Sequence, residues 1–313
     1  PLWSRGLGDV YKRQTLWSWG ENSNGQLGVG DITDRSSPVQ VGSLTNWSSI
    51  TASDYNHSIA TKTDGTLWSW GRNDYGQLGQ NDITHRSSPV QVGSLTNWSS
   101  VAGGYWHSIA TKTDGTLWSW GVNSNGQLGL GDTTDRSSPV QVGSLTNWSL
   151  ISAGYQHSIA TKTDGTLWSW GNNTYGNLGQ NDRSASSSPV QVGTLTNWSS
   201  MAAGFQHTIA TKTDGTLWSW GNNGDGQLGV GDRTHRSSPV QVGSLTNWSS
   251  IAGSYAHTIA TKTDGTLWCW GANDYGQLGQ NNITHRSSPV QVGSLTNWSC
   301  LLYTSPSPRD QRG

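Results

Sequence analysis

The stretch His57–Gly79 reads HSIATKTDGTLWSWGRNDYGQLG, and near-copies of it run through most of the 313-residue chain. The cluster Leu-Trp-Ser-Trp-Gly, with Cys269 replacing serine in the last copy, begins at Leu16, Leu67, Leu117, Leu167, Leu217 and Leu267. The first interval is 51 residues and the others are 50. Such a period indicates an array of one supersecondary unit. A residue that is present in every copy is therefore explained first by the fold.

One copy, residues 48–98, predicts four short strands. They are expected at Ser48–Ala52, His57–Thr63, Thr66–Trp70 and Pro89–Gly93. Asp64-Gly65 between two alternating runs indicates a hairpin, and Pro89 suits the first position of a strand. Gly, Thr, Ser and Asn are too frequent for a helix, and no 3.6-residue period is present. Four antiparallel strands in each copy are typical of an all-β protein, a β-propeller of four-stranded blades, with a solenoid of β-coils as the alternative.

The length of the Asp64-Gly65 turn sets which side chains share a blade face. A two-residue turn pairs Thr61 with Trp68, Ile59 with Trp70, Ala60 with Ser69 and Lys62 with Leu67. The indoles would then share a face with Ile59, and the small residues Ala60 and Ser69 would leave room for the indoles of the adjoining blade. A three-residue loop with a glycine bulge would shift this pairing by one. We expect Trp47 and its equivalents to be core residues.

Composition and charge narrow the class of protein. Gly is abundant (41 residues), Trp reaches 20, and no apolar run approaches the ~20 residues of a membrane span. The chain ends depart from the repeat at Arg13-Gln14 and at Cys300-Leu301, so we expect 1–14 and 300–313 to be non-native or artefactual ends and 15–299 to be the propeller repeats. Those repeats carry 13 Lys and Arg against 17 Asp and Glu. This acidic balance argues against a nucleic-acid partner.

Two motifs carry a family resemblance. Trp70–Gly79 (WGRNDYGQLG) and residues 102–110 (AGGYWHSIA) resemble the two halves of the regulator of chromosome condensation repeat, and the resemblance covers all of 15–299. It implies a propeller that is commonly seven-bladed. With six copies of the last two strands and five of the first two, the chain would supply five complete blades plus a half, as a fragment of such a ring.

The same resemblance implies possible functions. The founding member of the family exchanges nucleotide on the GTPase Ran and binds chromatin. Here the even spacing leaves no room for a specialised protruding hairpin, and the acidic repeats argue against nucleosome contact. Near-identical copies look like the bacterial members of the family, some of which are secreted or surface proteins that bind other proteins. This favours an extracellular or cell-surface location.

Several motifs that could carry chemistry are better explained by the repeat. His57, His107, His157, His207 and His257 are equivalent, one per blade, so we expect structural histidines bonded to backbone and neither a catalytic residue nor a metal site. The loop from Asn73 to Asp82 has too few carboxylates for calcium. No phosphate-binding glycine loop is present, and no cofactor is expected. Asn-Trp-Ser at Asn46, Asn97, Asn147, Asn197, Asn247 and Asn297 fits the N-glycosylation pattern but is also simply the repeat.

The informative positions are those at which the copies differ. They follow the first strand, follow Trp-Gly, and include Asp34, His85, Asp135, Ala185, His235 and His285. Because strand direction alternates, the loop between strands one and two and the loop between strands three and four should emerge at the same end, which we call the rim. Loops on a rigid scaffold commonly carry binding. The predicted partner-binding rim residues are Tyr55, Asn56, Asp74, Tyr75, Tyr105, Trp106, Tyr155, Gln156, Tyr175, Phe205, Gln206, Asp225, Tyr255, Asp274 and Tyr275. The alternative is neutral drift in exposed loops.

These observations favour a non-enzymatic scaffold whose rim binds a protein partner. Tyr, Trp, Asn and Asp suit protein interfaces, and they also suit sugar stacking, so a lectin-like, carbohydrate-binding propeller is the first alternative. A guanine nucleotide exchange factor for a small GTPase is the second, by family analogy alone. A hydrolase is least supported, because no copy differs from the others in a way that would make one catalytic site.

Overall fold

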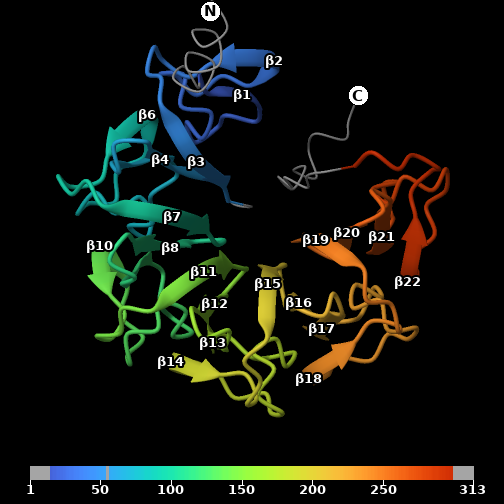
Figure 1. The fold of residues 1–313 in the computed structure, drawn as a ribbon. Coiled ribbons are helices and arrows are strands. Elements are labelled where there is room, and N and C mark those ends of the chain that lie inside the picture. Colours follow the sequence, from blue (N-terminus) through green and yellow to red (C-terminus); the bar gives the residue numbers. More distant parts are fainter. Residues whose placement is uncertain (1–14, 54–55, 299–313) are drawn as a thin grey trace, which may run out of the picture. The chain divides into compact units, whose positions relative to one another are not determined.

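A computed structural model describes residues 15–53 and 56–298, and every regular element in these ranges is a β-strand (Figure 1). The terminal segments expected to be non-native, 1–14 and 300–313, lie outside the described residues, as does Tyr55. Within the described ranges there is no helix that could cross a membrane.

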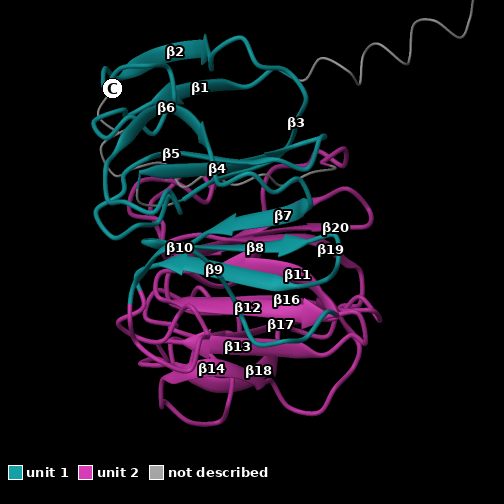
Figure 2. Ribbon diagram, turned by 90° about the vertical axis from the view of Figure 1, so that its left-hand side faces the viewer, with its two compact units in different colours: residues 1–122, 135–146, 306–313 teal, residues 123–134, 147–305 magenta. Residues whose placement is uncertain are grey.

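The strands fall into two compact units, coloured separately in Figure 2. Of the described residues, unit 1 comprises 15–53, 56–122 and 135–146, and unit 2 comprises 123–134 and 147–298. Unit 1 holds β1 (Trp17–Gly20), β2 (Arg35–Gln40), β3 (Trp47–Ala52), β4 (His57–Lys62), β5 (Leu67–Gly71), β6 (Arg86–Gln91), β7 (Trp98–Gly103), β8 (His107–Lys112), β9 (Leu117–Gly121) and β10 (Arg136–Gln141). Unit 2 holds β11 (Trp148–Ala153), β12 (His157–Lys162), β13 (Leu167–Gly171), β14 (Ser186–Gln191), β15 (Trp198–Ala203), β16 (His207–Lys212), β17 (Leu217–Gly221), β18 (Arg236–Gln241), β19 (Trp248–Gly253), β20 (His257–Lys262), β21 (Leu267–Gly271) and β22 (Arg286–Gln291).

Each repeat forms one antiparallel sheet in sequence order. Unit 1 has the two-stranded sheet β1-β2 and two four-stranded sheets, β3 to β6 and β7 to β10, and unit 2 has three four-stranded sheets, β11 to β14, β15 to β18 and β19 to β22. In unit 2 the first strands β11, β15 and β19 lie next to one another, while the fourth strands lie furthest from them (Figure 1). The prediction of four-stranded antiparallel blades is confirmed, and the coils of a solenoid are not observed in the described residues.

The hairpin register differs by one residue from the two-residue turn, so that predicted pairing is wrong. Ser58 faces Trp70, Ile59 faces Ser69, Ala60 faces Trp68 and Thr61 faces Leu67. The connection is a three-residue loop in which the Gly65 N–H donates to the Lys62 carbonyl at 2.9 Å. Gly65 has a φ of +76°, and a Cβ there would lie 2.0 Å from the Thr96 carbonyl oxygen. This left-handed glycine favours the bulged loop over the tighter turn.

The shift changes which surface receives the indoles. In unit 2 the face of the β15 to β18 sheet that carries Ile209 and Leu217 packs against Trp248 and Trp270 of the next sheet. The face that contacts the indoles of the next sheet therefore presents Ile209 and Leu217, not the small residues that were predicted. Ala260 lies on the same face of its own sheet as the indoles. Trp220 and Trp270 are fully buried. The Trp47 equivalents behave as expected of core residues up to Trp248, which is 5% exposed, whereas Trp298 is 39% exposed.

A second set of contacts joins neighbouring sheets within each unit. The carbonyl of Gln227 accepts hydrogen bonds from Trp270 Nε1 and from Thr258 Oγ1, both at 2.9 Å. We call such a carbonyl with its two donors a junction clasp. Equivalent clasps centre on the carbonyls of Gln26, Gln77, Gln127 and Asn177. A Cβ at Gly229 would lie 2.6 Å from Trp270 Nε1, so the second glycine of the Gly-Gln-Leu-Gly motif makes room for the indole.

Candidate interaction site

The repeated histidines are buried parts of the sheet junctions. His207 is 0% exposed, and its Nε2 lies 3.1 Å from Thr258 Oγ1 of the next sheet. Since that hydroxyl donates its hydrogen to the Gln227 carbonyl, it accepts from the imidazole, which places the ring proton on Nε2. His57 and His157 make the same contact with Ser108 and Thr208. The expectation of structural histidines holds, but the partner of Nε2 is a side-chain hydroxyl rather than the backbone.

Burial also fixes the charge state of these rings. It lowers the pKa of His57 and His207 to about 3 and that of His157 and His257 to about 4, because a buried imidazolium loses its hydration. These four histidines are therefore neutral near pH 7. The neutral rings of His57, His157 and His207 each bond a hydroxyl of the next sheet, so they hold neighbouring sheets together.

The Asn-x-x-Gly-Gln-Leu-Gly loop uses its polar groups internally. Asn73 Nδ2 donates to the carbonyls of Asp82 and Thr84, and Asn73 Oδ1 accepts from the Leu78 N–H. The Asp82 carboxylate accepts from the Thr84 N–H and pairs with Arg86. Residues 15–53 and 56–298 contain no group of three or more His, Cys, Asp or Glu side chains that could hold a metal ion. The loop geometry is that of an Asx-stabilised turn.

The Asn-Trp-Ser motifs are tied to the packed ends of the sheets. The side-chain oxygens of Asn97, Asn147, Asn197 and Asn247 are buried, and the tryptophan that follows each is a core residue. The carbonyl of Asn197 also accepts from the Thr213 N–H at 2.9 Å. These contacts favour the structural explanation of the motif.

In unit 1 the variable loops meet through their aromatic side chains. Tyr75, from the loop between β5 and β6, lies 5.2 Å from Trp106, which belongs to the loop between β7 and β8. Trp106 also contacts Tyr105 at 4.6 Å. Asp74 is exposed and pairs with Arg72 and with His85 Nε2. Asn56 is half-buried with a φ of +66°, and its carbonyl accepts from the Arg72 N–H.

In unit 2 the first loops of three successive sheets form an aromatic stack. Phe205 lies between Tyr155, at a centroid distance of 4.0 Å, and Tyr255, at 4.2 Å. The Tyr155 N–H donates to the Phe205 carbonyl, and the Phe205 N–H donates to the Ser254 carbonyl. Tyr255 ends the stack with 59% of its surface exposed. We call Tyr155, Phe205 and Tyr255 the aromatic ladder.

The other loops of unit 2 emerge at the same end as the ladder. The Asn172 N–H donates to the Gln156 carbonyl at 2.7 Å, and Asn222 Nδ2 donates to Gln206 Oε1 at 3.2 Å, so each bond joins the two variable loops of one sheet. Tyr175 packs edge-on against His235 and is half-buried.

A histidine between two carboxylates links the last two sheets of unit 2 at this end. His285 Nε2 lies 2.9 Å from Asp274, and its Nδ1 lies 3.4 Å from Asp225 of the preceding sheet. Tyr275, on the same loop as Asp274, is 66% exposed. The rim of unit 2 thus combines stacked rings, exposed phenols and carboxylates.

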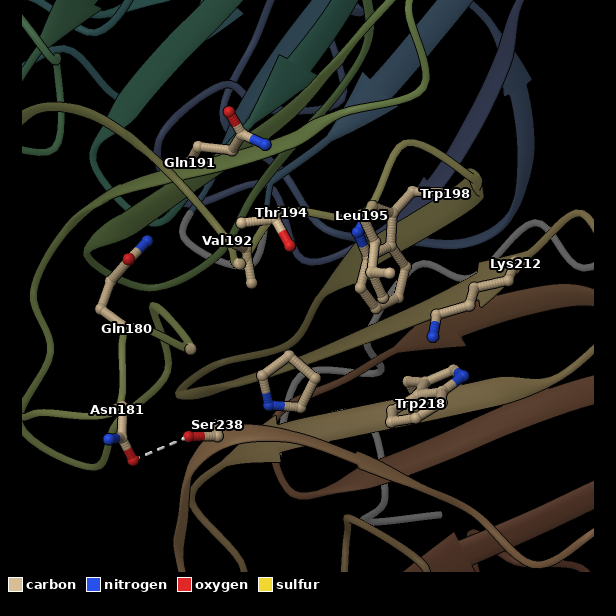
Figure 3. Close-up of a pocket in the computed structure, with 13 residues that line it drawn as sticks. Gln180, Asn181, Gln191, Val192, Thr194, Leu195, Trp198, Lys212, Trp218 and Ser238 are labelled. Atoms are coloured by element: carbon tan, nitrogen blue, oxygen red, sulfur yellow. Dashed lines mark hydrogen bonds between the residues drawn. The ribbon is translucent and has the colours of Figure 1, made fainter.

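A pocket away from the rim residues was not expected from the sequence. In unit 2 it measures about 510 Å³ and opens between the β11 to β14 and β15 to β18 sheets (Figure 3). Its lining includes Gln180, Leu195, Trp198, Lys212, Trp218 and Pro239. Burial lowers the pKa of Lys212, and the nearby charge of Asp214 opposes that shift. The copies share most of these residue types, so sequence variation could not have pointed to the pocket.

The sequence matches one repeat family along nearly its whole described length. The profile described as "Regulator of chromosome condensation (RCC1) repeat" matches residues 15–60, 64–111, 114–161, 164–211, 214–261 and 264–299. A second profile with the same description matches 47–77, 98–127, 148–177, 198–227 and 248–277.

Similar curated proteins align over short segments. The chain is 35% identical over 88 residues to the RCC1 domain-containing protein RUG3, mitochondrial, of Arabidopsis thaliana, an alignment covering 28% of this chain and 20% of that protein. It is 40% identical over 78 residues to the ultraviolet-B receptor UVR8 of Arabidopsis thaliana, covering 25% of this chain and 18% of the receptor. It is 38% identical over 93 residues to human alsin, covering 29% of this chain and 5% of alsin. The aligned segments therefore span a fifth or less of these relatives.

Solved structures share the fold at low sequence identity. Human WBSCR16 superposes with a TM-score of 0.79 at 23% identity, over 89% of this chain and 76% of that one. Prp20p of Saccharomyces cerevisiae superposes with a TM-score of 0.65 at 20% identity, over 91% of this chain and 87% of that one, and its report describes binding to Gsp1p and histones. These similarities show the repeat β-propeller fold.

Proposed function

Because the chain belongs to the regulator of chromosome condensation (RCC1) repeat family, we propose that it is a non-enzymatic interaction scaffold whose rim binds a protein partner. The aromatic ladder of unit 2 carries this proposal. A continuous stack across three sheets gives the variable loops a fixed base, and it ends at the exposed ring of Tyr255.

The chemistry around the ladder supports a protein as the partner. Tyr and Trp are enriched in protein interfaces because a large ring is buried while its polar group still bonds. Tyr255 and Tyr275 are the exposed rings of this rim, and Asp274 adds an exposed carboxylate beside Tyr275. A partner surface with an apolar depression bordered by Lys or Arg complements this set.

A matched pair of variants tests the rim. The rim variant combines Tyr255→Ser, Tyr275→Ser and Asp274→Asn. The control variant carries Leu245→Ser and Leu295→Ser, two exposed side chains on the segments that follow the fourth strands, at the opposite end of the sheets. Proteins cross-linked to the wild-type chain in extracts of the source cells are identified by mass spectrometry and then titrated in purified form.

We expect the rim variant to weaken binding of the purified partner by at least about tenfold, since central aromatic residues commonly supply more than 1 kcal/mol each. The control variant should bind as the wild type does. Equal binding by the rim variant and the wild type, with both correctly folded by circular dichroism, would contradict the proposal.

The two alternatives have assays of their own. Carbohydrate binding finds its support in Tyr275, which is 66% exposed, whereas Tyr75 is 38% exposed beside Trp106 and Tyr175 is half-buried against His235. A glycan-array signal that disappears in Tyr275→Ala would favour that alternative. Guanine nucleotide exchange is tested by release of labelled GDP from small GTPases in the presence of the full chain.

A further inference from the structure

Lys212 is an enclosed cation at the wall of the unit 2 pocket. The residue is 8% exposed, and its Nζ lies 3.6 Å from the ring centroid of Trp218 and 5.1 Å from that of Trp198. Figure 3 shows the ammonium directed over Trp218 toward the pocket. Among residues 15–53 and 56–298, no carboxylate forms an ion pair with Nζ and no oxygen accepts a hydrogen bond from it.

The nearby aspartate does not fill this role. The Asp214 carboxylate accepts hydrogen bonds from the Thr216 N–H at 3.0 Å and from Thr216 Oγ1 at 2.6 Å. It therefore organises the hairpin loop and acts on Lys212 only through its charge. A cation that has lost most of its water without gaining an anionic partner is costly, so the site favours an incoming anion.

The rest of the pocket suits an apolar group next to that anion. Trp218, Trp198, Val192, Leu195 and Pro239 supply its apolar walls, and Leu195 is 45% exposed. A volume of about 510 Å³ is within the range of sites that hold small ligands.

Side-chain amides provide polar contacts beside the apolar walls. Gln180 Nε2 donates to Ser169 Oγ at 3.1 Å, which leaves its Oε1 to accept. Asn181 Oδ1 accepts from Ser238 Oγ at 3.0 Å, which leaves its Nδ2 to donate (Figure 3). One acceptor and one donor are what a peptide unit requires, because its N–H and C=O both need partners. This pairing favours a peptide over a simple organic acid.

We propose that this pocket binds the C-terminal residue of an extended peptide. The terminal carboxylate pairs with Lys212, and the last side chain, which is apolar, lies against Trp218 and Leu195. The amides of Gln180 and Asn181 bond the main chain of the peptide. Gln180 and Asn181 belong to the loop between β13 and β14, but none of the predicted rim residues lines the pocket, so this site is distinct from the one proposed above for a protein partner.

A related pocket in unit 1 provides a matched control. It measures about 310 Å³ and is lined by Leu95, Trp98, Trp118 and Pro139, but Lys112 is not part of its lining. Lys112 is otherwise equivalent to Lys212: it is 6% exposed and lies 3.6 Å from the Trp118 centroid. Lys112→Met and Lys212→Met therefore remove the same cation–π contact, while only the second removes a charge from a pocket wall.

The test is calorimetric titration of the full chain with three probes. They are the acetylated peptide Gly-Ser-Gly-Phe with a free C-terminus, the same peptide as a C-terminal amide, and 3-phenylpropionate. We expect the free-acid peptide to bind. The amide and 3-phenylpropionate should each bind more than about tenfold more weakly, because each lacks either the charge or the peptide units.

The variants locate the site. Lys212→Met should weaken the free-acid peptide by more than about tenfold, while Lys112→Met and the rim variant should bind it as the wild type does. Absence of binding by the free-acid peptide, equal binding of its amide or of 3-phenylpropionate, or an unaffected Lys212→Met would each overturn the proposal. The probe comparison on the wild type decides the matter even if Lys212→Met does not fold. If the rim variant loses its protein partner but still binds the free-acid peptide, the result supports the rim proposal and leaves the peptide site intact.

Discussion

At the scale of single residues, burial of the histidine rings makes the free energy of unfolding depend on pH. Each ring is neutral in the folded protein and bonds a hydroxyl of the adjoining sheet in the contacts of His57, His157 and His207. In the unfolded chain the same ring meets water and has an ordinary pKa near 6.5. Folding therefore lowers the pKa of each ring. The stability of the folded chain is fully present above about pH 6.5 and falls as the pH drops below that value.

This difference predicts acid destabilisation. As the pH falls from about 6.5 toward about 4, the unfolded chain binds protons that the folded chain cannot, which costs up to about 1.4 kcal/mol per pH unit for each buried histidine. Urea unfolding between pH 4.5 and pH 7 should show this slope. His157→Gln should reduce it by about one histidine's share, since glutamine does not titrate.

The matched control for that experiment is Thr208→Val. It removes the hydroxyl that His157 Nε2 contacts but keeps the buried, titratable ring. Stability should fall at every pH while the slope stays as in the wild type. An unchanged slope in His157→Gln would show that burial of this ring is not the source of the pH dependence.

At the scale of elements, the junction clasp explains why glycine recurs in the loop before each fourth strand. Gly179 has a φ of +71°, and a Cβ there would lie 2.8 Å from Trp220 Nε1. The indole could then no longer reach the Asn177 carbonyl, to which it donates at 3.0 Å. Gly243 has a similar φ, +62°, but a Cβ there would meet no atom within 4 Å.

These two glycines predict different costs for the same substitution. Gly243→Ala should lower the free energy of unfolding by about 1–2 kcal/mol, the cost of a left-handed backbone at alanine. Gly179→Ala should lower it by that amount plus about 1–3 kcal/mol for overpacking against Trp220. Chemical denaturation of both variants measures the two free energies of unfolding. Equal losses would mean that the indole shifts without penalty and that the clasp contributes little.

The four strands of each repeat could be predicted from the sequence, because the fifty-residue period and the Asp-Gly turns are signals that lie within one copy. The register could not, because the choice of a three-residue loop depends on the Thr96 carbonyl oxygen lying against Gly65, a contact with a segment 31 residues away. The clasps were missed for the same reason. A buried histidine can be expected from its repetition, but its hydroxyl partner lies in the next copy, 51 residues along the chain.

At the scale of the whole molecule, equivalent positions do not have equal environments. Trp19 and Trp120 occupy the same place in the repeat, yet Trp19 is 60% exposed and Trp120 is 0% exposed. The sheet that carries Trp19 has two strands, and the sheet that carries Trp120 has four. The same residue at equivalent positions of two copies therefore contributes unequally to the free energy of unfolding.

That contrast predicts the effect of deleting either indole. Trp120→Ala should cost about 3–5 kcal/mol, as large core truncations do, whereas Trp19→Ala should cost less than about 1 kcal/mol because most of its surface already meets water. Urea unfolding followed by far-ultraviolet circular dichroism compares the two. A large loss from Trp19→Ala would mean that the indole is covered in solution.

For the candidate site, the sequence could supply the rim residues but not how they are used. Strand alternation is enough to predict that the variable loops share one end. It does not predict that Tyr155, Phe205 and Tyr255 stack, or that Tyr175 is covered by His235, since these depend on spacing between sheets. The pocket at Lys212 was missed because its residue types recur in every copy and its shape arises only between sheets.

The junction clasp has a consequence for how such chains arise and how they can be re-engineered. Among the described residues, each inner copy donates an indole N–H and a Ser or Thr hydroxyl to the copy before it and offers a backbone carbonyl to the copy after it. Duplicating one fifty-residue segment within a unit therefore supplies both halves of a new interface at once. Internal duplication of a segment can therefore lengthen the array without a new kind of contact.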